Sequence, residues 1–174
     1  MSRINRDRKK SHNPKIKNMK NKIFNLNDGG RIDAGYKGVT GDCVVRAIAI
    51  AVELPYQEVY DTLYDRAKYI RDNGRCQIAR DYRDRGCSPR TGVHRKVYDE
   101  YLKSMGWKWK PTMQIGSGCK VHLRSDELPS GRIITRLSRH VCAVIDGVIQ
   151  DTYDPSRNGT RCVYGYYYNP NEGK

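Results

Sequence analysis

The most constraining stretch of the chain is an apolar run with a cysteine at its start, over residues 41–52. Gly41 and Asp42 favour a turn and a helix N-cap, and almost every residue after Cys43 is a helix former or an apolar side chain. The run is apolar on nearly all faces, so we predict a buried helix from Cys43 to about Leu54. Because free backbone N–H groups and the helix dipole favour a thiolate in the first turn, Cys43 lies where a nucleophilic cysteine gains reactivity.

A predicted β-hairpin about a hundred residues later carries a histidine and a candidate acid. Its two apolar runs flank Asp146-Gly147, a dipeptide typical of two-residue hairpin turns. In the register that this turn sets, His140 and Asp151 are diagonal neighbours on one face, about 7–8 Å apart at the backbone and within reach of a hydrogen bond. Asp154 has the opposite parity, and a bulge in the second strand would favour it instead.

Cysteine, histidine and acid, in this order, are the groups of a thiol catalytic triad. The acid fixes one imidazole nitrogen, and the other nitrogen takes the thiol proton and later protonates the leaving group. The backbone N–H of Cys43 would help to hold the oxyanion. Each group also has a structural explanation, because a cysteine can fill space in an apolar helix, a histidine can be a satisfied strand residue and an aspartate can cap a loop.

The other patterns predict helices in the first half of the chain. Pro55 opens a second helix whose apolar and aromatic residues recur at spacings of three and four. Thr91 caps a third helix that stops at Gly106. Between these helices, residues 71–91 mix charges with glycine and lack periodicity, so we expect an irregular connection that is either a functional lid or a plain loop.

Strands are predicted in the second half. Residues 107–110 alternate tryptophan and lysine, which indicates a strand with the tryptophans turned inward. Further strands are expected at residues 133–137, 140–145, 148–153 and 162–168. The fold class is therefore α+β, with N-terminal helices packed on a C-terminal antiparallel sheet and with Cys43 at the start of the central helix.

The positive charge is concentrated at the N-terminus. Of a net charge of +14, residues 1–22 contribute nine Lys and Arg against one Asp. We expect a basic, disordered tail over residues 1–30 and a single domain over residues 31–174. The tail is either a contact for an anionic partner, such as nucleic acid or an acidic protein, or a solvated leader.

Six cysteines and no apolar signal segment favour a reducing, cytoplasmic compartment over a disulfide-rich secreted protein. The chain has no C-x-x-C pair, so we expect no metal and no cofactor. It also has no stretch of about 20 apolar residues, so we expect no membrane span.

The Cys43, His140 and acid order resembles the papain-like cysteine peptidase superfamily, which includes transglutaminase-like and peptidoglycan-cleaving enzymes. Residues 41–47, 136–140 and 151–155 are also similar to uncharacterised bacteriophage proteins. The resemblance covers about residues 31–155. It implies a papain-like fold, with Cys43 as nucleophile, His140 as general base and acid, and Asp151 as the group that orients His140.

Two departures from related families concern the residues before the cysteine. Papain-type enzymes place an oxyanion glutamine six positions before it, where this chain has Lys37. The second oxyanion donor is therefore open between Thr40 and a loop backbone N–H. Ovarian-tumour deubiquitinases have an aspartate three positions before the cysteine, where this chain has Thr40.

Two functions follow as expectations. The first is a thiol hydrolase or acyltransferase that acts through a thioester on a peptide, isopeptide or other amide bond, in the host cytoplasm if the protein is phage-encoded. The alternative is a non-catalytic papain-like protein that binds nucleic acid or an acidic host protein. In that alternative the ligand is bound by the basic tail, Lys108, Lys110 and the arginines within residues 66–96.

Overall fold

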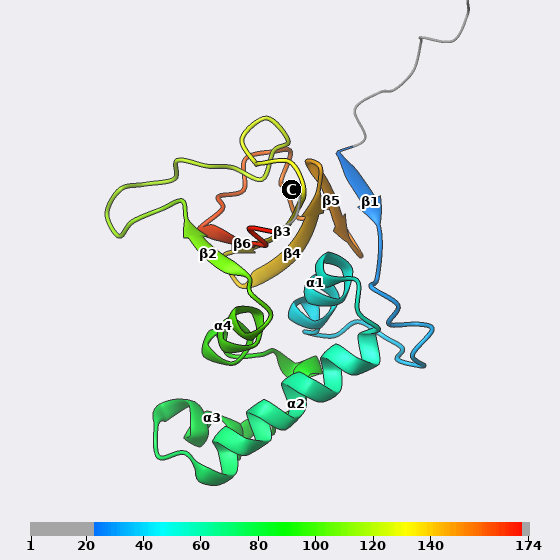
Figure 1. The fold of residues 1–174 in the computed structure, drawn as a ribbon, viewed down its shortest axis with the longest axis vertical. Helices are drawn as coiled ribbons and strands as arrows, with labels where there is room; N and C mark the ends of the chain where they lie inside the picture. Colours follow the sequence, from blue (N-terminus) through cyan, green and yellow to red (C-terminus); the bar gives the residue numbers. More distant parts are fainter. Residues whose placement is uncertain (1–22, 172–174) are drawn as a thin grey trace, which may run out of the picture.

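The computed structural model describes residues 23–171, which form an α+β fold with four α-helices on one side of a six-stranded sheet (Figure 1). The helices are α1 (Cys43–Val52), α2 (Tyr56–Asn73), α3 (Gln77–Arg85) and α4 (Arg95–Ser104), with a short 3₁₀ helix η1 (Pro89–Thr91) before α4. The strands are β1 (Phe24–Leu26), β2 (Lys108–Pro111), β3 (Arg132–Leu137), β4 (His140–Ile145), β5 (Val148–Asp151) and β6 (Gly165–Tyr168). Among the described residues, no helix has the length and apolar character needed to cross a lipid bilayer.

The sheet has the strand order β1-β5-β4-β3-β6-β2. All neighbouring strands are antiparallel except β1 and β5, which run parallel. The β4–β5 hairpin turns at Asp146-Gly147 and pairs Ala143 with Gln150, so the predicted register is confirmed. The strands expected from the apolar patterns are all present, to within a few residues at their ends.

Residues 24–30 belong to the domain, which corrects the boundary that we expected at Arg31. Strand β1 pairs with β5, and the Ile149 N–H donates to the Ile23 carbonyl over 3.1 Å. The side chains of Asn27 and Asp28 then accept backbone N–H groups and fold a turn. A three-residue edge strand has no sequence periodicity, so the pattern did not reveal it. Residues 1–22 of the expected tail lie outside the described residues.

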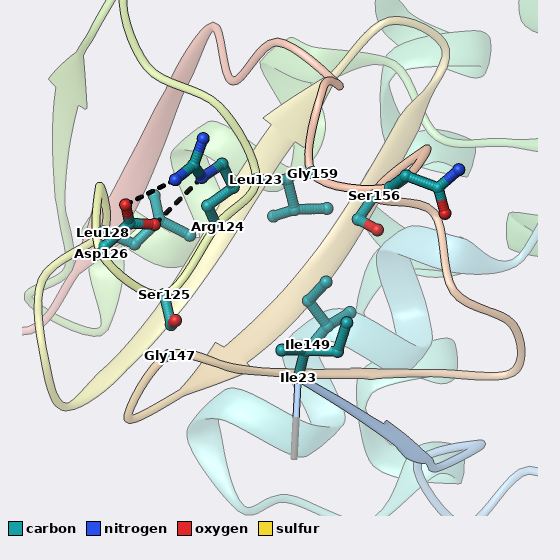
Figure 2. Close-up of a pocket in the computed structure, with 11 residues that line it drawn as sticks. Ile23, Leu123, Arg124, Ser125, Asp126, Leu128, Gly147, Ile149, Ser156 and Gly159 are labelled. Atoms are coloured by element: carbon teal, nitrogen blue, oxygen red, sulfur yellow. Dashed lines mark hydrogen bonds and ion pairs between the residues drawn. The ribbon is translucent and has the colours of Figure 1, made fainter. Parts of the chain in front are cut away.

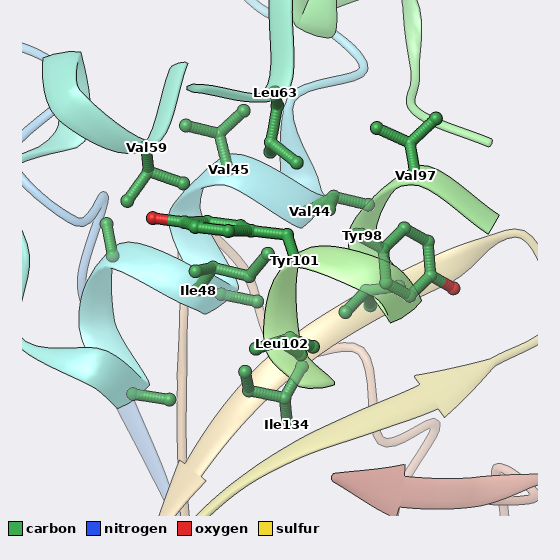
Figure 3. Close-up of a cluster of buried hydrophobic side chains, with 14 of the residues drawn as sticks. Val44, Val45, Ile48, Val59, Leu63, Val97, Tyr98, Tyr101, Leu102 and Ile134 are labelled. Atoms are coloured by element: carbon green, nitrogen blue, oxygen red, sulfur yellow. The ribbon is translucent and has the colours of Figure 1, made fainter. Parts of the chain in front are cut away.

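Helix α1 lies between the sheet and α2 and is buried along almost its whole length (Figure 1). Val45 and Ile48 of α1 pack with Leu63 of α2, Leu102 of α4 and Ile134 of β3 in one cluster of buried side chains (Figure 3). This cluster fixes the position of α1, and therefore of Cys43, relative to β3 and β4.

The segment 71–91 is largely helical, which corrects the prediction of an irregular connection. Helix α3 occupies its centre, but only Ala79 and Tyr82 of this helix are buried. Two buried residues in an otherwise charged helix give too weak an apolar pattern to be recognised. Thr91 lies in η1 rather than capping the next helix, because Gly92 adopts a φ of 100° and α4 begins only after His94.

A second apolar cluster lies on the other face of the sheet, under the long connection between β2 and β3. Leu123 and Leu128 of this connection pack against Val144 and Ile149. Cys119 of the connection is joined by a disulfide to Cys162, and the two Cα atoms are 5.7 Å apart. The expectation of a reducing compartment favours free thiols, so this covalent link was not foreseen.

Candidate active site

Cys43, His140 and Asp151 meet where the start of α1 reaches one end of the β4–β5 hairpin. Cys43 is the first residue of α1 and is half-buried, while His140 opens β4 and Asp151 ends β5. Because these two strands are antiparallel, their first and last residues lie at the same end of the hairpin. The Nε2 atom of His140 is 2.6 Å from Oδ2 of Asp151, and both side chains are buried.

The second nitrogen of His140, Nδ1, is not bound by Asp151. Asp151 occupies Nε2, and the Tyr153 hydroxyl lies 3.4 Å from Nδ1. Burial lowers the pKa of His140, but hydrogen bonds with Asp151 and Cys43 outweigh it and raise this pKa to about 9. The imidazole is therefore charged at neutral pH, which is the state that stabilises a neighbouring thiolate.

A buried network behind Asp151 holds the carboxylate in place. Its Oδ1 atom accepts a hydrogen bond of 2.9 Å from Nη2 of Arg46, one turn along α1 from Cys43. Nη1 of Arg46 donates to Oδ1 of Asp42, and the hydroxyl of Tyr56 donates to Oδ2 of Asp42 over 2.8 Å. Burial alone would raise the pKa of Asp151, but His140, the Thr152 backbone N–H and Arg46 lower it, so Asp151 stays ionised.

Arg46 was not recognised from the sequence as a residue of the site. A usable signal was present, because Arg46 is a charged residue in an otherwise apolar helix and lies four positions after Asp42. Asp42 occupies the N-cap position, but its side chain makes no capping hydrogen bond, contrary to our expectation. The carboxylate is instead used by Arg46 and Tyr56, so the helix start is left open toward the cleft.

The start of α1 offers two hydrogen-bond donors for an oxyanion. Within residues 23–171, the backbone N–H of Cys43 has no acceptor. The Oγ1 atom of Thr40 is buried, has no hydrogen-bond partner in this part of the chain, and belongs to a residue lining the same cleft. Of the two open candidates for the second donor, Thr40 thus has an unused hydroxyl beside the site.

Asp154, the alternative acid, lies in a different environment. Its side chain is exposed and accepts the Ser156 backbone N–H over 2.8 Å, which closes a turn. Its position agrees with the hairpin parity that favours Asp151. His94 also lines the cleft, but its interactions are with Asp81 and Tyr82, and the pKa of His94 is lowered by burial and by Arg85.

Two helices begin at or next to a cysteine, α1 at Cys43 and α3 at Cys76. Cys76 occupies the N-cap of α3, is exposed, and has its pKa lowered, chiefly by the backbone N–H of Ala79. Cys87 and Cys142 are buried, and burial raises the pKa of Cys142 to about 12. Cys43 differs from Cys76 in lining the same cleft as His140, whose pKa it helps to raise. In the described chain, no group of three or more His, Cys, Asp or Glu residues could hold a metal.

Cys43 and His140 line an open cleft of about 830 Å³, which is large enough for an extended chain of several residues. A smaller pocket of about 230 Å³ lies at the second apolar cluster, between the β2–β3 connection and the residues that follow β5 (Figure 2). This pocket is lined by Leu123, Leu128 and Ile149 and contains none of the candidate catalytic residues.

Comparisons with models of protein families, with curated proteins and with solved structures found no match. The function is therefore inferred from the chemistry of the site. That site combines a thiol at a helix N-terminus, a charged imidazole lining the same cleft, and an ionised carboxylate held by a buried arginine.

Proposed function

We propose that this protein is a thiol hydrolase or acyltransferase that acts on a peptide, isopeptide or other amide bond through a papain-like arrangement of residues. The observation that supports this most strongly is the buried 2.6 Å contact between His140 and Asp151, at a cleft that Cys43 also lines and where Cys43 helps to raise the pKa of His140. Cys43 is the nucleophile, His140 is the general base and acid, and Asp151 orients His140.

The first half of the reaction forms a thioester. The thiol proton already resides on Nδ1 of His140, so the Cys43 thiolate attacks the carbonyl carbon of the amide directly. The backbone N–H of Cys43 and the hydroxyl of Thr40 donate to the oxyanion. When the tetrahedral intermediate collapses, the C–N bond breaks and His140 gives its proton to the departing amine.

The second half releases the acyl group. His140, now neutral at Nδ1, takes a proton from water or from an acceptor amine as that nucleophile attacks the thioester carbonyl. The C–S bond then breaks, the sulfur departs as a thiolate, and His140 keeps the proton, which restores the thiolate–imidazolium pair. Water yields a carboxylic acid, and an amine yields a new amide, so the identity of the second nucleophile distinguishes a hydrolase from an acyltransferase.

The test is selective alkylation of Cys43 in the folded full-length protein. Because Cys76 is exposed and has a lowered pKa, the experiment uses a Cys76→Ser background. Limiting iodoacetamide at about pH 6, below the ordinary thiol pKa, should modify Cys43 first, and peptide mass mapping identifies the modified residue.

The matched variant His140→Ala should slow alkylation of Cys43 by at least about tenfold, because the thiolate loses its imidazolium partner. Tyr153→Phe serves as the control for a change beside the same ring, since it removes only the 3.4 Å contact with Nδ1. Equal rates with and without His140 would overturn the proposal. The non-catalytic binding protein would then be the better explanation.

A further inference from the structure

Four arginines line the cleft that contains Cys43, and no aspartate or glutamate lines it. Arg85 is the last residue of α3 and Arg95 is the first residue of α4. Arg136 lies on β3, and Arg139 is in the turn immediately before His140. The positive charges therefore come from two walls of the cleft, one formed by α3 and α4 and one by the β3–β4 hairpin.

These four guanidinium groups have no carboxylate partner within residues 23–171. The structure pairs other arginines with acids, as in the contacts of Arg46 with Asp151 and Arg124 with Asp126. Three of the cleft arginines instead stack on aromatic rings: Arg85 on Tyr82, Arg95 on Trp109 and Arg136 on Tyr164. Stacking orients a guanidinium but leaves its charge uncompensated, so the cleft is suited to an anionic ligand.

The site favours an acidic peptide over a nucleic acid for two reasons. Of the two tyrosines that line the cleft, Tyr98 is buried and Tyr153 alone is exposed, whereas binding of single-stranded nucleic acid relies on several open rings on which successive bases stack. Cys43 also requires an amide carbonyl, and apolar residues beside it, including Val44 and Val141, provide a surface for a peptide main chain.

We propose that the ligand of this cleft is a peptide segment with aspartate or glutamate side chains on both sides of the amide bond presented to Cys43. The proposal rests on the proposed function for the position of that amide bond. Arg85 and Arg95 bind acidic side chains on one side, and Arg136 and Arg139 bind them on the other. Guanidinium and carboxylate groups form charge-assisted hydrogen bonds that are frequently bidentate.

The first experiment measures the electrostatic potential at the Cys43 thiol with two alkylating agents that differ in charge. Iodoacetate is an anion and iodoacetamide is neutral, so their rate ratio at Cys43 reports the surrounding charge. The variant Arg95→Gln/Arg139→Gln removes one exposed arginine from each wall. It should lower the iodoacetate to iodoacetamide ratio by about two- to fivefold per charge removed.

The matched control is Arg75→Gln/Lys120→Gln, which removes two exposed positive charges outside the cleft. This control has the same net charge as the Arg95→Gln/Arg139→Gln variant. Its ratio should equal that of the parent protein. An equal drop in both double variants would overturn the proposal, because overall charge and not the cleft would then be responsible.

The second experiment measures binding to a Cys43→Ala variant by fluorescence anisotropy. The probes are a labelled glutamate-rich decapeptide, its glutamine-rich counterpart and a ten-nucleotide single-stranded DNA. We expect the glutamate peptide to bind at least about tenfold more tightly than the glutamine peptide. This difference in affinity should disappear when Arg95→Gln/Arg139→Gln (the cleft double variant) is added, and should persist when Arg75→Gln/Lys120→Gln is added. If DNA binds more tightly than the glutamate peptide and depends on Arg95 and Arg139, the ligand is a nucleic acid and the proposal is overturned.

The outcomes separate this inference from the proposed function. If His140→Ala leaves alkylation unchanged but the glutamate peptide still requires the cleft arginines, catalysis fails and acidic-peptide binding stands. If His140 controls alkylation but the cleft double variant changes neither the rate ratio nor peptide affinity, catalysis stands and the acidic ligand is rejected.

Discussion

Asp151 divides its two carboxylate oxygens between the imidazole and a buried guanidinium. Oδ2 contacts His140, and Oδ1 accepts from Arg46 and from the Thr152 backbone N–H. The carboxylate is thus held from one side by its own strand end and from the other by α1. A substitution at this one position disturbs both the orientation of His140 and the attachment of α1 to β5.

Asp151→Asn should therefore lower the rate of Cys43 alkylation and any amide turnover by at least about tenfold, because the imidazolium loses its charged partner. Asp154→Asn removes only an acceptor in an exposed turn and should leave both rates within about twofold. Alkylation kinetics in the Cys76→Ser background give the comparison. If Asp154→Asn had the larger effect, the assignment of Asp151 would be incorrect.

His140 should make stability depend on pH above neutrality. Its pKa is raised to about 9, whereas a histidine in an unfolded chain titrates near 6.5. Its contribution is therefore complete below about pH 6.5 and is lost as the pH rises toward 9. The free energy of unfolding, measured with urea at pH 6, 7.5 and 9, should fall more steeply with rising pH for the parent protein than for His140→Gln. Parallel pH profiles would contradict the raised pKa.

At the scale of elements, Arg46 joins α1 to β5 through a pair of buried carboxylates. Arg46→Met leaves Asp42 and Asp151 each without a charged partner and should lower the free energy of unfolding by about 3–5 kcal/mol. Tyr56→Phe removes one hydrogen bond to Asp42 and should cost about 1.5–3 kcal/mol. Arg71→Met, at an exposed ion pair, is the control and should leave the unfolding midpoint nearly unchanged. Equal losses for Arg46 and Arg71 would show that the buried network contributes nothing.

The disulfide joins the β2–β3 connection to the segment before β6. Cys119 and Cys162 are 43 residues apart, so chain-entropy arguments give a stabilisation of up to about 4 kcal/mol. Reduction should lower the free energy of unfolding of the parent protein but leave that of Cys119→Ser/Cys162→Ser unchanged. Peptide mapping without reductant should recover the linked pair. Recovery of free Cys119 and Cys162 from freshly purified, alkylated protein would refute the link.

The elements that could be predicted from the sequence are those marked by a pattern within a few neighbouring residues. The Asp146-Gly147 turn was sufficient to set the hairpin register, and the apolar run after Cys43 was sufficient to place α1. Helix α3 was missed because only two of its residues are buried, and β1 was missed because it has three residues. The Arg46–Asp151 contact spans 105 residues, so only the three-dimensional structure could reveal that partner.

At the scale of the whole molecule, the N-terminal boundary of the fold can be located by truncation. Removal of residues 1–22 should leave the free energy of unfolding within about 0.5 kcal/mol of the parent value. Removal of residues 1–30 also deletes β1 with the partly buried Phe24, and should cost about 2 kcal/mol or more. Denaturant unfolding of both truncations tests this. Loss of cooperative unfolding in the shorter deletion would place essential structure before Ile23.

The 105-residue separation between Arg46 and Asp151 also determines when the site can assemble during synthesis. Helix α1 leaves the ribosome long before β4 and β5, and at about 5–20 residues per second the delay is roughly 5–20 s. During this interval the nascent chain carries the Cys43 thiol without its imidazole and carboxylate partners. The three side chains of the candidate site therefore meet only once β5 has been translated and docked against α1, so the site cannot assemble on a partly synthesised chain.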